Sequence, residues 1–361
     1  MQRVLNFSAG PSTLPVEVLE QVAKDMVNYK GCGMSVMEMS HRSSSYGDIQ
    51  AQAKEDFKEL LQIGDDYELL FLQGGGSTQF SMIPLNLLQK DDKADYLVTG
   101  SWAKKAYEEA KRYADVAVLA SSKEDNFTYI PKINVSDIRS GAKFLYICTN
   151  NTIYGSRISP EKIQEIDYPM VADMSSNILS EVYDINKFDL IFAGAQKNIG
   201  PSGVSLVVVK KELVGQAQES TPTMLDYKTH VEKDSMYNTP PCFNIYVSGL
   251  VAQWVKDQGG VKAMEEKNKE KAKLLYEYLD NSKIFKNPVV QEDRSLMNVV
   301  FVTGDKELDA EFVSSAKKAG LENLKGHRSV GGMRASIYNA MPIDGVERLV
   351  NCMKEFERAN S

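Results

Sequence analysis

The sequence has little of the residues that build metal centres and disulfide frameworks. Its 361 residues include three histidines and four cysteines, Cys32, Cys148, Cys242 and Cys352, with no C-x-x-C pair and no metal-ligand spacing. A His-rich metal site is therefore not expected, and no metal is predicted. Scattered cysteines of this kind also fit a reducing compartment.

Long apolar runs are also missing. Residues 1–11 lack the apolar segment of a secretory signal, and the longest apolar stretches are strand-length, far below the roughly 20 residues of a membrane span. No Lys/Arg-dense stripe offsets the net charge of −7, which argues against nucleic acid as a partner. We therefore expect a soluble, cytoplasmic protein that acts on small molecules, with no membrane or nucleic-acid partner.

What the sequence does have is a regular alternation of strand-like and helix-like segments. This alternation is typical of an α/β protein whose mostly parallel sheet is flanked by helices. The predicted strands of this sheet are residues 67–73, 95–99, 116–120, 144–148, 170–173, 190–193 and 204–209. In such sheets, ligands gather at the carboxyl ends of the strands.

The two ends of the chain carry further signals. Near the start, Ser12 or Thr13 is predicted to cap a helix that runs to about Lys30. From 244 to 280 the pattern is nearly all helical, interrupted at residues 259–260, and a smaller α/β segment follows. From this pattern and the chain length, we expect two domains. The large domain spans 16–258, and the small domain combines 1–15 with 259–361.

Two charged residues stand where charges are uncommon. Lys197 follows a hydrophobic run and precedes a Gly-rich turn, and Asp173 ends another such run. A lysine and an acid at the carboxyl ends of two buried strands are what a pyridoxal phosphate enzyme requires. The lysine forms the Schiff base and the acid pairs with the pyridinium nitrogen. Taken alone, the pair could equally be two loop charges of an ordinary α/β protein.

Three neighbouring features could complete such a site. The Gly-rich segment 73–79 follows a predicted strand and opens a helix, as anion-binding turns do, although a plain βα turn has the same pattern. It matches neither the Walker loop nor G-x-G-x-x-G. Trp102 follows another strand, where an indole can stack on a cofactor ring or pack in the core. Thr152 offers a hydroxyl at the same edge of the sheet.

With these residues in place, the chain closely resembles the phosphoserine aminotransferases, which are class V, fold-type I enzymes dependent on pyridoxal phosphate. The resemblance runs nearly end to end, and its longest segment is too long to arise by chance. The segments that carry it are 6–11, 35–42, 74–76, 172–176, 193–201, 238–241 and 325–342.

The resemblance assigns roles to individual residues of this chain. Lys197, Asp173 and Trp102 would be catalytic, with Trp102 stacked on the cofactor ring and Thr152 bonded near its phenolic oxygen. The phosphate of the cofactor would be held by Gly76, Ser77 and Gln196, and by Asn238 and Thr239 of the neighbouring subunit in a homodimer. Some family members have a basic residue where this chain has Ser77, a change that backbone N–H contacts to the phosphate would survive.

Substrates of the family carry an α-carboxylate and a distal phosphate or carboxylate, so two cationic groups are needed. Arg334 would clamp a carboxylate through its planar fork. His41, Arg42, His327 and Arg328 form a second, denser set that suits a doubly charged phosphate. Each His-Arg pair alone could be a surface charge pair. Two such pairs, however, use two of only three histidines, which argues against a surface role for both.

The implied reaction interconverts 3-phosphohydroxypyruvate and L-glutamate with O-phospho-L-serine and 2-oxoglutarate, a step of L-serine biosynthesis. A related phosphorylated threonine, 4-phosphohydroxy-L-threonine of vitamin B6 synthesis, is a further family substrate. The alternative within class V is a lyase of the cysteine desulfurase kind, which uses a reactive C-terminal cysteine. The C-terminal Cys352 lies in a predicted helix, which disfavours the lyase. A non-enzymatic protein on the same scaffold is disfavoured by the presence of both Lys197 and Asp173.

Overall fold

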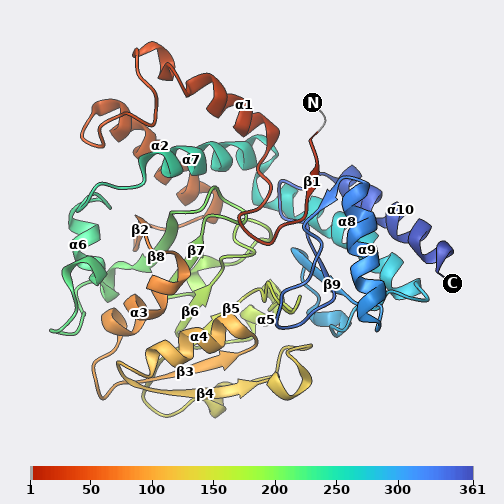
Figure 1. Ribbon diagram of the computed structural model, residues 1–361. Helices are drawn as coiled ribbons and strands as arrows, with labels where there is room; N and C mark the ends of the chain where they lie inside the picture. Colours follow the sequence, from red (N-terminus) through yellow and green to blue (C-terminus); the bar gives the residue numbers. More distant parts are fainter. Residues whose placement is uncertain (1–2, 361) are drawn as a thin grey trace.

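A seven-stranded sheet organises the larger part of the chain in the computed structural model, which describes residues 3–360 (Figure 1). The strand order is β2-β8-β7-β6-β5-β3-β4. The bounds are β2 Tyr67–Leu72, β3 Lys93–Val98, β4 Asp115–Ser121, β5 Ala142–Cys148, β6 Met170–Asp173, β7 Leu190–Gly194 and β8 Ser205–Lys210. Strand β8 runs antiparallel to β2 and β7, and the other pairs are parallel. The predicted mostly parallel sheet is confirmed.

Helices cover both faces of this sheet, which explains why its central strands are apolar throughout. Alternate residues of a strand point to opposite faces. Leu69 and Phe71 of β2 belong to a core with α2 and α7, whereas Leu70 and Leu72 belong to a core with α3 and α4. The helices of this part are α1 Val16–Asp25, α2 Ser44–Leu61, α3 Gly75–Leu87, α4 Ser101–Ala110, α5 Pro160–Gln164, α6 Tyr227–Glu232 and α7 Cys242–Asp257.

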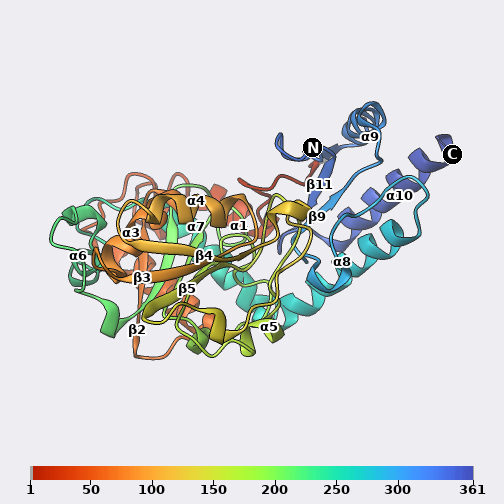
Figure 2. The ribbon, with the colours of Figure 1, turned by 90° about the horizontal axis from the view of Figure 1, so that it is seen from below.

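Residues 260–360 form a second lobe beside the sheet, as Figure 2 shows. Its elements are α8 Gly260–Asn281, β9 Asn298–Phe301, α9 Lys306–Lys318, β10 Leu321–Glu322, β11 Met333–Ser336 and α10 Ile343–Ala359. Strand β9 pairs with β11 in antiparallel fashion, and β10 pairs in parallel with the N-terminal strand β1, Leu5–Asn6. This lobe has its own apolar core, which includes Phe7. On that basis we propose the division into 16–258 and 1–15 with 259–361.

Short 3-10 turns connect the main elements. They are η1 Tyr29–Gly31, η2 Lys123–Asp125, η3 Val135–Asp137, η4 Ile185–Lys187, η5 Lys211–Leu213, η6 Thr223–Leu225 and η7 Gln291–Asp293. Between α7 and α8 the backbone turns at Gly259, whose φ is 98°, in the region that glycine adopts without strain. No helix within residues 3–360 combines the length and apolar character needed to cross a membrane.

The predicted start of the first helix was wrong in detail. Pro15 takes the N-cap position of α1, and no side chain caps the helix. Ser12 instead donates from Oγ to the carbonyl oxygen of Lys197 at 2.5 Å. The helix ends at Asp25 and not near Lys30, which lies in a turn with φ 47°. The Ser12 side chain, which local sequence rules assign to a helix cap, therefore makes a tertiary hydrogen bond instead.

Candidate active site

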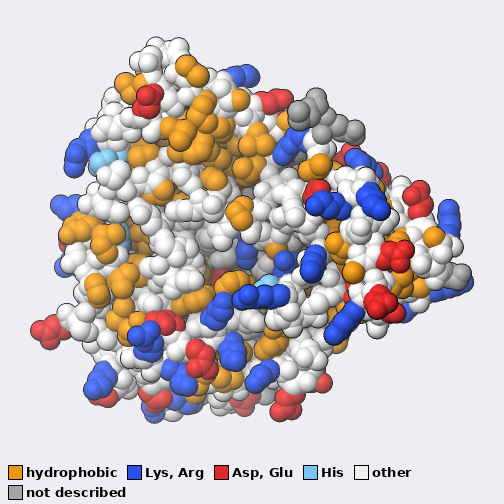
Figure 3. Space-filling view, viewed as in Figure 1, with side chains coloured by type: hydrophobic (Ala, Val, Ile, Leu, Met, Phe, Trp, Pro, Cys, Tyr) orange, Lys and Arg blue, Asp and Glu red, His pale blue; other side chains and the backbone are white. Residues whose placement is uncertain are grey.

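A cavity of about 370 Å³ lies at the carboxyl edge of the sheet and brings together most of the predicted site residues. Nine of them line it: Gly76, Ser77, Trp102, Thr152, Asp173, Gln196, Lys197, His327 and Arg334. Both lobes contribute, since the last two belong to the smaller lobe. Figure 3 shows Lys and Arg side chains gathered around the hollow where the lobes meet. The setting is therefore one that attracts anions.

Lys197 and Asp173 reach this cavity from neighbouring strands. Asp173 is the last residue of β6, and Lys197 lies in the turn after β7. The Lys197 amine donates from Nζ to Thr152 Oγ1 at 2.8 Å. Burial lowers the pKa of this amine, a shift that the Asp173 carboxylate opposes and Arg334 assists. A lysine with a lowered pKa can be uncharged, and so can act as a nucleophile or a base.

The Asp173 carboxyl is almost fully buried and has few partners. Burial raises its pKa, whereas the Lys197 ammonium and the hydrogen bond from Ser175 N to Oδ1, at 2.9 Å, lower it. Ser175 is fixed in turn, because its Oγ accepts from Gly194 N at 3.1 Å. A buried carboxylate of this kind is stabilised by a cationic partner placed against it. A protonated ring nitrogen placed against Asp173 would be such a partner, which is the role predicted for this residue.

The N-terminus of α3 forms one wall of the cavity. Gly74 precedes this helix with φ 90°, and a Cβ there would lie 1.9 Å from Thr78 Oγ1, so only glycine fits. The first turn of α3 contains Gly76 and Ser77. Because the first N–H groups of a helix have no partner within the helix, they bind phosphate oxygens well. The N-terminus of the 13-residue α3 therefore lies at the cavity wall, where the sequence predicts a phosphate-binding turn, and that role stays a prediction.

Trp102 sits at the start of α4 and lines the same cavity. Its indole Nε1 is buried without a hydrogen-bond partner among the described residues. The Lys105 ammonium lies 4.4 Å from the centre of the ring. An aromatic face on the cavity wall, with an N–H left unpaired, is what a stacked, oxygen-bearing ligand would use.

The smaller lobe contributes a cationic side to the cavity. Arg334 donates from Nη1 to Thr152 O at 3.2 Å, which leaves most of its guanidinium donors for a ligand. Burial lowers the pKa of His327, and the nearby cations Arg334, Arg328 and Lys105 lower it further. Arg328 is exposed and does not line the cavity.

Four other predicted residues lie outside the cavity of this single chain. They are His41, Arg42, Asn238 and Thr239. Thr239 nevertheless lies close to the turn that precedes α3, because Gln73 Nε2 donates to its carbonyl oxygen at 3.1 Å. His41 and Arg42 precede α2, with Arg42 exposed. These positions stay predictions for a second subunit or a bound substrate.

Sequence reasoning from single positions missed several residues of the cavity wall. Ala9, Gly10, Gly75, Phe80, Ile153 and Ser175 also line it. Gly10 has φ 139°, and a Cβ there would lie 3.3 Å from Lys197 Cγ, so its small size admits the lysine side chain. The segments 6–11 and 172–176, which carry the family resemblance, were the available signal for Gly10 and Ser175.

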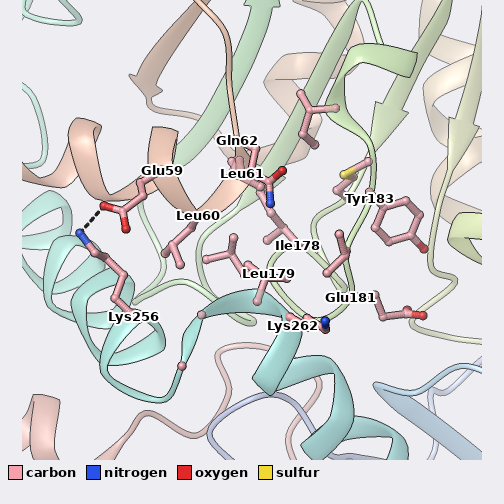
Figure 4. Close-up of a pocket in the computed structure, with 16 residues that line it drawn as sticks. Glu59, Leu60, Leu61, Gln62, Ile178, Leu179, Glu181, Tyr183, Lys256 and Lys262 are labelled. Atoms are coloured by element: carbon pink, nitrogen blue, oxygen red, sulfur yellow. Dashed lines mark ion pairs between the residues drawn. The ribbon is translucent and has the colours of Figure 1, made fainter.

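A second cavity, of about 410 Å³, lies between the end of α2, the loop 174–185 and the junction of α7 with α8 (Figure 4). It contains none of the predicted site residues. Lys256 pairs with Glu59 at 2.6 Å beside it. Glu181 is buried nearby with Oε1 2.5 Å from Arg157 Nη1, and burial raises the pKa of its carboxyl to about 7.

The features of the first cavity, at the carboxyl edge of the sheet, fit pyridoxal phosphate. A lysine with a lowered pKa, a buried acid, an aromatic wall with an unpaired N–H, and a helix N-terminus surround one cavity. Across residues 3–360 there is no cluster of three or more His, Cys, Asp or Glu residues able to hold a metal ion.

Comparison with known proteins supports the same conclusion. A family model described as aminotransferase class V matches residues 4–349. The chain is 55% identical to a phosphoserine aminotransferase of Bacillus cereus over the full length of both, and 51% identical to phosphoserine aminotransferase 2, chloroplastic, of Arabidopsis thaliana, covering 99% of this chain and 85% of that one.

Solved structures agree. Phosphoserine aminotransferase from Bacillus circulans superposes with a TM-score of 0.96 at 43% identity, with both chains fully covered. The PLP-bound enzyme from Trichomonas vaginalis gives 0.92 at 39% identity, covering 98% of this chain and all of that one. The chain therefore belongs to the class V, fold-type I aminotransferases and, among them, to the phosphoserine aminotransferases, which depend on pyridoxal phosphate.

Proposed function

We propose that this enzyme transfers an amino group between L-glutamate and 3-phosphohydroxypyruvate, giving O-phospho-L-serine and 2-oxoglutarate in L-serine biosynthesis. The observation that carries the proposal is the joining of Lys197, Asp173 and a helix N-terminus in one cavity with a cationic side. The names of relatives at 51–55% identity support the same substrate. The related 4-phosphohydroxy-L-threonine of vitamin B6 synthesis is a second candidate substrate.

Residues of the chain have separate tasks toward the cofactor. Lys197 would hold pyridoxal phosphate covalently at rest, and Asp173 would hold a proton on its ring nitrogen. Trp102 would cover the ring, Thr152 would bond near the phenolic oxygen, and the phosphate would rest on Gly76, Ser77 and Gln196. When bound, the cofactor supplies an electron sink that acidifies the Cα–H of an amino acid.

Lys197 then has a second task, as the base. Its Nζ takes the proton from Cα of the substrate, general acid–base work typically worth about 10²–10⁴-fold in rate. An uncharged amine is needed, and the burial that lowers the pKa of Lys197 favours that form. Thr152 Oγ1 accepts a hydrogen bond from Lys197 Nζ at 2.8 Å and so orients the amine before the substrate binds.

Substrate recognition falls to the cations of the site. Arg334 would bind the α-carboxylate that both amino acids share. His41, Arg42, His327 and Arg328 would bind the distal group, which is a carboxylate in glutamate and a phosphate in phosphoserine. A phosphate has three acceptor oxygens and nearly two charges, so it can engage more of these cations than a carboxylate can.

We also propose a cytoplasmic homodimer with shared active sites. The segment 238–241 contains two prolines, which restrict its backbone, and Asn238 and Thr239 lie outside the cavity of their own chain. In the dimer, these residues would complete the phosphate site of the partner. Exposed apolar side chains of the N-terminal region, Val16, Leu19, Val27, Met34 and Met37, would then be covered by the second subunit.

The alternative lyase lacks a nucleophile in the site. Cys352 lies on α10 against the core of the smaller lobe, and burial raises the pKa of its thiol. Cys148 is nearer to Lys197, but burial also raises its pKa well above the usual range. Neither thiol is prepared to be a thiolate.

A coupled assay tests the proposed function. We expect transamination of 3-phosphohydroxypyruvate by glutamate to exceed that of unphosphorylated hydroxypyruvate by at least 100-fold in kcat/KM, which corresponds to about 2.7 kcal/mol. The variant Lys197→Ala is the control for activity that does not come from this site. Equal turnover of the two keto acids would refute the assignment of a phosphorylated substrate.

A further inference from the structure

A buried polar network joins the two lobes close to the carboxyl ends of β5 and β6. At its centre is Asn298, the first residue of β9, which is fully buried. Its Nδ2 donates to Ser336 Oγ at 3.0 Å and to Tyr338 OH at 3.1 Å. Its Oδ1 accepts from Asn150 Nδ2 at 2.8 Å. The side chain thus uses both of its donor hydrogens and its acceptor oxygen.

The network continues into the larger lobe through Asn150. Its Nδ2 also donates to Ser176 Oγ at 2.8 Å, and its Oδ1 accepts from Ser295 Oγ at 2.5 Å. Asn150 lies two residues before Thr152, and Ser176 lies three residues after Asp173. The network therefore holds the carboxyl ends of β5 and β6, which position Thr152 and Asp173 in the active site.

The third connection runs to the N-terminal segment. Tyr338 OH donates to Ala9 O at 2.7 Å, and Ala9 and Gly10 line the cofactor cavity. Because Tyr338 also accepts from Asn298, one asparagine side chain links three parts of the chain that are remote in sequence.

Arg334 is carried by the same unit. Strand β11 pairs Ser336 with Asn298 and Arg334 with Val300, so Arg334 and Ser336 lie on the same face of the strand. The position of β11 therefore determines where the Arg334 guanidinium lies in the cavity. In the structure, its Nη1 donates to Thr152 O at 3.2 Å.

We propose that Asn298 is a positioning residue that fixes the Arg334 guanidinium relative to Lys197, and so sets how well the α-carboxylate of the amino acid binds. The inference rests on the proposed function, in which Arg334 binds that carboxylate. A buried network of this kind favours one arrangement of the lobes, because a shift between them would break the bonds that Asn150 makes with Asn298 and Ser295. A shift of about 1 Å can cost 100-fold in rate when it misplaces a reacting pair.

Two variants test the inference in the full-length enzyme loaded with cofactor. Asn298→Ala removes the central amide, and Tyr338→Phe removes only one hydroxyl and is the milder change. We expect kcat/KM for Asn298→Ala to fall at least tenfold, equally for glutamate and phosphoserine, through a raised KM. For Tyr338→Phe we expect a loss of about threefold in the same pattern. The ratio of the two substrates should stay within twofold of the wild-type ratio.

A second readout does not depend on activity. Hydrogen–deuterium exchange of residues 333–338 in the cofactor-loaded protein without substrate should be at least tenfold faster in Asn298→Ala than in the wild type. The matched control is Asn86→Ala, because Asn86 is also a buried asparagine, whose Nδ2 donates to Met82 O and Leu225 O within the larger lobe. We expect this control to change neither exchange in 333–338 nor KM.

The possible outcomes separate the inference from the function beneath it. A normal KM in Asn298→Ala, or the same loss in Asn86→Ala, would overturn the positioning role. If Asn298→Ala does not fold, an unchanged KM in Tyr338→Phe overturns it instead. A normal KM in Arg334→Ala would reject the carboxylate clamp itself, and with it this inference. A raised KM in Arg334→Ala with a normal KM in Asn298→Ala rejects the inference alone.

Discussion

Replacing Arg334 by alanine should damage the two half-reactions by the same factor. The guanidinium donates one N–H to Thr152 O, at 3.2 Å, and the Arg334 side chain lines the cavity. Removing one partner of a desolvated, hydrogen-bonded charge pair costs about 2–5 kcal/mol. That cost corresponds to a fall in kcat/KM of about 30-fold to several thousand-fold.

The measurement is single-turnover kinetics of each half-reaction, followed by the visible band of the bound cofactor. Glutamate and phosphoserine share the α-carboxylate, so their losses should agree within about threefold. Arg334→Lys should lose less than Arg334→Ala, because the charge remains while the fork is lost. The control is Arg112→Ala. This arginine is exposed and forms a surface ion pair with Glu109, and such pairs contribute about 0–1 kcal/mol.

Two results would contradict this reasoning. A loss below threefold in Arg334→Ala would mean that the carboxylate binds elsewhere. A loss more than tenfold larger for phosphoserine than for glutamate would mean that Arg334 reads the phosphate. Such a result would move Arg334 into the set that we assign to the distal group.

Four further predictions concern other parts of the molecule. Lys197→Ala should abolish transamination and remove the pH-sensitive visible band of the bound cofactor, and a variant that keeps both would refute the assignment. Asp173→Ala should retain some cofactor, measured by absorbance after dialysis, but lose most activity; near-normal turnover would show that the acid is only structural. Mixing inactive Lys197→Ala chains with an inactive Asn238/Thr239 double-alanine variant should restore partial activity, and no recovery after verified subunit exchange would argue against shared sites. Burial raises the pKa of Glu181 to about 7, so the folded state keeps a proton that the unfolded state releases at lower pH. The contribution of this proton to the free energy of unfolding is complete below about pH 4.5 and is lost as the pH rises through 7. In urea unfolding, the free energy of unfolding of the wild type should therefore fall by about 3 kcal/mol between pH 4.5 and 7 because of this group. Glu181→Gln should not show this fall, and an unchanged pH profile would contradict the raised pKa.

The strands could be read from the sequence because each is a short apolar run bounded by turn residues. Strand β6 was predicted at 170–173, where it lies, and most other ends differ by one or two residues. Direction was harder to predict, since nothing in the run 204–209 shows that β8 is antiparallel to its neighbours. A strand buried on both faces has the same composition in either direction.

The residues of the site divide in a similar way. Lys197 and Asp173 could be identified because a charge at the end of an apolar run stands out locally. Ser12 was misread as a cap, because its partner, the Lys197 carbonyl, lies 185 residues away. Asn298 gave no signal at all, since its bond to Asn150 depends on how two lobes dock. Docking is set by surfaces that no local pattern describes.

The pairing of β1 with β10 has a consequence for how the protein is made. Leu5 pairs with Leu321, and Phe7 belongs to a core otherwise built from residues 272–356. Translation at about 5–20 residues per second therefore leaves the first strand without its partner for about 15–60 s. Until then, the backbone of β1 has no strand to pair with and Phe7 has no core to enter, so the smaller lobe can form only after its C-terminal elements have been synthesised.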